Sequence, residues 1–129
     1  MKKILTIILA CFLTSAWAQK QYNCYYVQEF KWNPKTSLND LEVKQNTVTS
    51  FKIDEQRKTL TQVFEDGSFT SVPVTSQDYN QESGILVYKT VSPANGYVYL
   101  YRVHTKDLVL EVIQDQNGVN TLLKKYLYK

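Results

Sequence analysis

Apolar and polar residues alternate along most of this chain, in short runs separated by polar turn residues. The alternation predicts strands at residues 22–32, 48–54, 59–65, 68–74, 84–91, 96–104, 107–114 and 119–128. Three pairs of turn residues separate such runs: Asp66-Gly67, Asn95-Gly96 and Asn117-Gly118. They predict hairpins, because their residues tolerate positive φ. The pattern does not favour βαβ units, since no stretch of about 10–15 residues repeats its apolar positions every 3.6 residues.

Two segments fit this pattern less well. In residues 36–46, Ser37 followed by Asp40, with Leu38 and Leu41, fits either one capped helical turn or an irregular edge strand. Residues 75–83 (TSQDYNQES) are polar throughout and predict the longest loop of the chain.

Seven or eight strands joined by short links predict an all-β fold, a single small antiparallel barrel or barrel-like sandwich. Periodicity does not decide between these two, because it does not encode how the first and last strands pair.

The first 18 residues have the three parts of a bacterial export signal. Lys2 and Lys3 precede an apolar run at residues 4–13, and Ala16-Trp17-Ala18 fits a small-x-small cleavage site. The apolar run is shorter than the roughly 20 residues that a membrane-spanning helix needs. We therefore expect residues 1–18 to be a signal peptide, residues 19–129 to be a single β domain, and the mature protein to be periplasmic or secreted.

The two cysteines qualify this picture. Ile8-Leu9-Ala10-Cys11 resembles a degenerate lipobox, so a lipoprotein anchored at Cys11 is the minor alternative. Cleavage after Ala18 would leave Cys24 as a lone thiol. We expect Cys24 to be buried as a small hydrophobic residue, because its neighbours are apolar and aromatic.

Charge and histidine content bear on several classes of function. The net charge is +3, two units of which come from Lys2 and Lys3, and no basic stripe is present, so the sequence does not favour nucleic-acid binding. His104 is the single histidine, and no motif places a nucleophile or metal ligands beside it. Cys24 lies among tyrosines, which would not lower its pKa as a reactive thiol requires. We therefore expect no enzyme, no metal and no cofactor.

Tyrosine is the compositional anomaly, with ten residues in the chain. On the strand predicted at residues 96–104, Tyr97, Tyr99, Tyr101 and Val103 share one face, and Tyr88 and Tyr126 can align with them across the sheet. The candidate binding residues are the tyrosines of the last four predicted strands: Tyr88, Tyr97, Tyr99, Tyr101, Tyr126 and Tyr128. Tyrosine combines a large apolar ring with a hydroxyl and suits protein interfaces as well as flat ligands.

The hairpin order and the export signal resemble lipocalin-like barrels. Phe30-Lys31 precedes Trp32 where that family has a Gly-x-Trp motif, so the resemblance is architectural and implies no function. The favoured interpretation is a non-enzymatic protein-binding module, inhibitor- or immunity-like, that contacts another envelope or secreted protein through a tyrosine-rich face. The alternative is a lipocalin-like carrier, with the same tyrosines around a small apolar or aromatic ligand.

Overall fold

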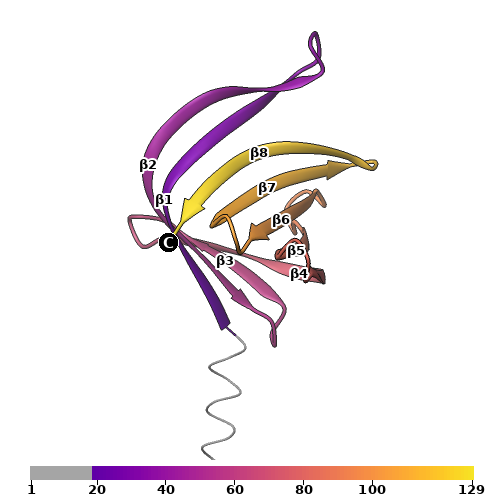
Figure 1. The fold of residues 1–129 in the computed structure, drawn as a ribbon. Coiled ribbons are helices and arrows are strands. Elements are labelled where there is room, and N and C mark those ends of the chain that lie inside the picture. The colour runs from indigo at the N-terminus through magenta and orange to yellow at the C-terminus, as the bar shows by residue number, and fades with distance from the viewer. Residues whose placement is uncertain (1–18) are drawn as a thin grey trace, which may run out of the picture.

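The computed structural model describes residues 19–129, and the predicted signal peptide and Cys11 lie outside this part of the chain. Eight strands follow one another (Figure 1): β1 Gln19–Asn33, β2 Leu38–Asp54, β3 Thr59–Val63, β4 Phe69–Asn80, β5 Ile85–Val91, β6 Val98–His104, β7 Val109–Gln116 and β8 Val119–Tyr128. Residues 19–129 contain no helix that could cross a membrane.

Each strand pairs antiparallel with the next one, and β8 returns to pair with β1. The eight strands therefore form a closed up-and-down barrel. This confirms the all-β prediction and decides between its two forms in favour of the barrel. An eight-stranded barrel has an interior that side chains can fill or that can hold one small ligand.

The core is built from residues that alternate inward along the strands. One row runs directly across five neighbouring strands, where Leu86 pairs with Val103, Val103 with Leu110, Leu110 with Tyr126, and Tyr126 with Val27. All five residues are buried in one hydrophobic cluster. Of the two faces predicted for β6, the one that carries Tyr101 and Val103 therefore points inward.

Glycine and asparagine form the hairpin turns that the sequence predicts. Between β7 and β8, Asn117 and Gly118 both have positive φ, 54° and 82°, as a two-residue type I′ turn requires. Between β3 and β4, Gly67 has a φ of 87°. There the side chain of Asp66 accepts a hydrogen bond from the main-chain N–H of Ser68 at 2.9 Å.

One open alternative is decided and one predicted boundary is wrong. Of the two forms expected for residues 36–46, the structure has the strand, because β2 begins at Leu38 and runs for 17 residues to Asp54. The loop predicted at residues 75–83 is too long: β4 continues to Asn80 and pairs with β5 from Val74 onward, so only the turn at residues 81–84 connects the two strands. The side chains of residues 75–80 are exposed, so they lack the apolar alternation from which a strand is recognised.

Candidate binding surface

The six predicted tyrosines do not form one outward face. Tyr88, Tyr126 and Tyr128 are buried in the core, with Tyr88 fully inaccessible. Tyr101 pairs with Tyr88 and packs against the same core. Tyr99 is half-buried, and Tyr97, which precedes β6, is exposed.

Aromatic rings contact one another inside the barrel. Phe51 lies between Tyr126 and Tyr101, with centroid distances of 5.0 and 6.0 Å, and Tyr22 meets Tyr128 edge-on at 4.9 Å. Such arrangements are favourable for aromatic pairs. Burial is the main reason that the pKa values of Tyr101 and Tyr126 rise to about 12. These tyrosines therefore act first as core residues.

Cys24 is buried beside them, as predicted. Its Sγ lies 3.9 Å from the carbonyl oxygen of Tyr22, and burial raises the pKa of its thiol to about 12. A reactive thiol needs the opposite shift. Nothing around Cys24 therefore activates it as a nucleophile.

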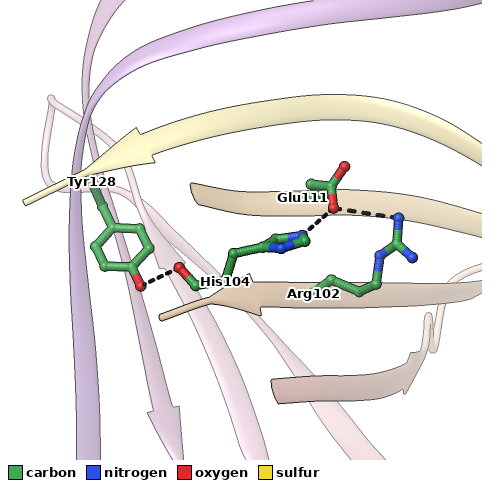
Figure 2. A network of polar contacts seen from close by, with 4 residues as sticks. All are labelled: Arg102, His104, Glu111 and Tyr128. Carbon is green, nitrogen blue, oxygen red and sulfur yellow. Dashed lines mark hydrogen bonds and ion pairs between the residues drawn. The ribbon is translucent and has the colours of Figure 1, made fainter. Parts of the chain in front are cut away.

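A polar cluster lies on the outer wall of β6–β8, and Figure 2 shows its members Arg102, His104 and Glu111. Arg102, Glu111 and Lys125 pair directly across three strands, on the face opposite the core. The carboxylate of Glu111 contacts Arg102 Nη2 at 3.3 Å and the Nε2 of His104 more closely. On the inner side, the hydroxyl of Tyr128 donates to the carbonyl oxygen of His104 at 3.1 Å.

The surface beside this cluster is a hollow of about 250 Å³. Its lining consists of His104, Asp107, Val109, Glu111 and Lys125, which include no hydroxyl or thiol group. Within residues 19–129, no three His, Cys, Asp or Glu side chains gather as metal ligands would. The contacts of Glu111 with Arg102 and His104 tie β7 to β6.

A different surface emerges where the β1–β2 hairpin extends beyond its neighbours (Figure 1). β1 pairs with β8 only from Cys24 to Glu29, and β2 pairs with β3 only from Ser50 to Asp54. Residues 30–43, which we call the arm, therefore form a two-stranded ribbon with both outer edges unpaired. Isolated two-stranded ribbons are only marginally stable in water.

The turn of the arm is well held. The side chain of Asn33 accepts a hydrogen bond from the main-chain N–H of Lys35 at 3.0 Å and donates one to Asp40 Oδ2 at 2.8 Å. Its main-chain carbonyl accepts a hydrogen bond from the N–H of Ser37 at 2.9 Å. These contacts fix the connection between the two strands of the arm.

One face of the arm carries three large apolar side chains, beside Asn39, which pairs with Trp32. Phe30 pairs directly with Leu41, and Trp32 lies two residues after Phe30 on the same face. Trp32 is 43% exposed and Leu41 is 42% exposed, although both are large apolar side chains. Leu38, next to the turn, is also exposed, but it pairs with Asn33 and lies on the opposite face of the arm.

These residues are not among the binding residues predicted from the sequence. The one sequence feature that points to them is the alternation of Phe30 and Trp32 at the end of a predicted strand, next to residues 36–46, whose structure the sequence leaves open. Without the register of β1 against β2, Leu41 could not be placed on the same face as Phe30.

Comparison with protein-family models, with curated proteins and with solved structures finds no match to this chain.

Proposed function

We propose that this protein is an exported, non-enzymatic module that binds another envelope or secreted protein through the apolar face of its arm. The observation that carries the proposal is the face on which the exposed Trp32 and Leu41 lie beside the half-buried Phe30, on a ribbon whose two outer edges are unpaired. Exposed apolar clusters on small proteins often mark interaction sites. Tryptophan is among the residues that most often dominate binding energy at protein interfaces.

This proposal keeps the expected class of function and moves the contact surface. The tyrosine-rich set contributes mainly to the interior, so the arm replaces it as the surface offered to a partner. Tyr97, just before β6, is the most exposed member of the set and could contact a partner without unfolding of the core.

The test is capture of a partner from envelope extract, followed by binding of the purified, identified partner to wild type and variants. We expect Trp32→Ala to weaken binding about 30-fold or more, since loss of an interface hot spot costs at least about 2 kcal/mol. Phe69→Ala is the matched control, because Phe69 is an exposed aromatic residue on the separate β3–β4 hairpin. Equal binding by wild type and Trp32→Ala would refute the role of the arm.

A small-molecule carrier is the second candidate, supported by the inward direction of the tyrosines in a closed eight-stranded barrel. A ligand would have to share the interior with Phe51, Tyr101 and Tyr126, whose rings already contact one another. Native mass spectrometry of the protein purified from the envelope tests this candidate. A co-purifying mass that is lost on denaturation would favour the carrier over the binding module.

Export and the absence of catalysis are tested separately. We expect the intact mass of the exported protein to begin at Gln19, whereas acyl chains on Cys11 would establish the lipoprotein alternative. In a broad hydrolase screen we expect no activity that disappears in His104→Ala or Glu111→Gln. Activity lost in either variant would make the outer-wall cluster an active site.

A further inference from the structure

Export gives this chain a first residue that can react with itself. The predicted cleavage after Ala18 makes Gln19 the N-terminal residue of the mature protein, and the inference below rests on this part of the proposed function. An N-terminal glutamine carries both a free α-amine and a side-chain amide. The atoms between the α-nitrogen and the side-chain Cδ complete a five-membered ring when these two atoms bond.

The reaction needs no partner molecule. The unprotonated α-nitrogen attacks Cδ of the side-chain amide, and the new N–Cδ bond closes a lactam ring. The bond between Cδ and Nε2 breaks, and Nε2 leaves as ammonia with a proton taken from the α-nitrogen. No group is oxidised or reduced. The α-amine of a protein has a pKa of about 7.7–8.0, so a fraction of it is unprotonated and nucleophilic at neutral pH.

Gln19 is accessible in the folded protein. It is the first residue of β1 and its side chain is exposed. Within residues 19–129 its strand neighbour is Asp54 of β2, since β8 pairs with β1 only from Cys24 onward. The side-chain amide donates a hydrogen bond to Asp54, which also accepts hydrogen bonds from the main-chain N–H groups of Gln56 and Arg57. Ring closure therefore gives up one exposed hydrogen bond and disturbs no core residue.

A blocked N-terminus protects the beginning of β1. Residues 19–22 pair with β2 alone, and chain ends of this kind are common sites of proteolysis. The next residue, Lys20, pairs through its ammonium with Glu55. Removal of Gln19 and Lys20 from a free α-amine would delete this ion pair and two residue pairs of the β1–β2 ladder. A lactam has no α-amine, so it stops stepwise trimming at the first residue.

We propose that the mature protein begins with pyroglutamate, formed from Gln19 by ring closure with loss of ammonia. Gln21 is the matched comparison within the chain, because it is exposed and lies on the same face of β1. Its main-chain nitrogen belongs to a peptide bond, where resonance makes it a poor nucleophile. The modification is therefore confined to the glutamine that cleavage exposes.

The intact mass of the mature protein isolated from the envelope tests the proposal. We expect wild type to be about 17 Da lighter than an unmodified chain that starts at Gln19, which is the mass of one ammonia. Gln21→Ala should show the same deficit, and Gln19→Ala should show none because it has no amide to attack. A broad-specificity aminopeptidase should shorten Gln19→Ala and leave wild type intact.

Three results would overturn the proposal. An unmodified mass starting at Gln19 that persists after incubation at neutral pH would refute ring closure and leave export intact. A deficit that remains in Gln19→Ala would place the loss of ammonia elsewhere in the chain. A mass that starts at another residue would refute the predicted cleavage site as well. Partner binding by the arm is measured separately with Trp32→Ala, so failure of this modification and failure of the proposed function are distinguishable.

Discussion

The hydroxyl of Tyr88 donates a hydrogen bond to Glu55 Oε1 across 3.2 Å, which joins a fully buried side chain of β5 to the turn after β2. Glu55 also pairs with Lys20 Nζ at 2.8 Å. Burial acts to raise the pKa of Glu55, but the hydrogen bond and charge of Lys20, with help from Gln77 and Tyr88, lower it overall. The contact therefore links β5 to the turn after β2 through a carboxylate whose pKa is lowered.

This contact predicts the effect of removing one hydroxyl. Tyr88→Phe keeps the ring in the core and deletes the hydrogen bond to Glu55, so the free energy of unfolding should fall by about 1–2 kcal/mol. Chemical denaturation measures the change. Tyr97→Phe is the control, because Tyr97 is exposed and should lose no more than a few tenths of a kcal/mol. Equal losses in both variants would contradict the role of the Tyr88 hydroxyl.

A second prediction concerns alkaline pH. Burial, with the charges of neighbouring groups, raises the pKa of Tyr22, Tyr101 and Tyr126 to about 12, above the value of about 10 in an unfolded chain. The folded state disfavours tyrosinate. The stability gained from keeping these hydroxyls protonated is therefore fully present below about pH 10 and is lost as pH rises towards about 12. We expect the denaturation midpoint to fall steeply over that interval.

The control for the alkaline transition is Tyr126→Phe. It removes one buried ionisable hydroxyl, whose nearest partner is Gln62 Nε2 at 3.5 Å. The variant should lose less stability than wild type between neutral and alkaline pH. A midpoint that stays constant up to about pH 12 in wild type would show that folding does not raise the pKa values of these hydroxyls.

Turn residues and the alternation of apolar and polar residues predicted most strands of the barrel. Asn117-Gly118 specifies a type I′ turn whatever its surroundings, and it forms one. Alternation also placed Tyr101 and Val103 on one face, which faces inward. The end of β4 was missed because Tyr79 and Asn80 are exposed and take part in the sheet only through pairing with β5. Closure was not predictable, since β1 and β8 meet only in three dimensions.

The exposed face of the arm could not be predicted from the sequence. Sequence periodicity identified the strand that ends near Trp32 but could not show that β8 stops pairing at Glu29. Whether an apolar residue is covered depends on the lengths of neighbouring strands, which only the assembled sheet determines. For the same reason, the tyrosines were recognised as one set without knowledge of whether they face inward.

The outer-wall cluster gives a third prediction. Glu111→Gln removes the charge shared by Arg102 and His104 with little change of shape. Because the Arg102 side chain is 42% exposed and can be rehydrated, the loss of stability should be at most about 1 kcal/mol. This loss of stability should be smaller at high salt, because salt screens the ion pair between Arg102 and Glu111. Lys89→Gln, at an exposed position of β5, is the control and should change little.

Thermal or chemical denaturation at low and high salt measures this difference. A loss of several kcal/mol in Glu111→Gln, independent of salt, would mean that the carboxylate is required by the fold rather than by the ion pairs alone.

The last prediction compares two glycines with similar backbones and different surroundings. Gly84 and Gly118 have positive φ values of 68° and 82°. Alanine is strained in this region, so each substitution should cost about 1–2 kcal/mol from the backbone alone. At Gly118 a Cβ would meet nothing within 4 Å, whereas at Gly84 it would lie 2.9 Å from Thr105 Oγ1.

Thr105 Oγ1 donates a hydrogen bond to the carbonyl oxygen of Gly84 at 2.7 Å. Moving this oxygen away from a new Cβ would therefore weaken that hydrogen bond. The main-chain N–H of Thr105 donates to the same carbonyl at 2.9 Å, so Gly84 anchors the turn between β6 and β7. Gly84→Ala should therefore destabilise the protein by about 1 kcal/mol more than Gly118→Ala. Urea denaturation of the two variants measures the difference, and Thr105→Ala should reduce it by removing the crowded hydroxyl. Equal losses at the two glycines would show that the turn moves aside freely, and that the contact with Thr105 does not hold it in place.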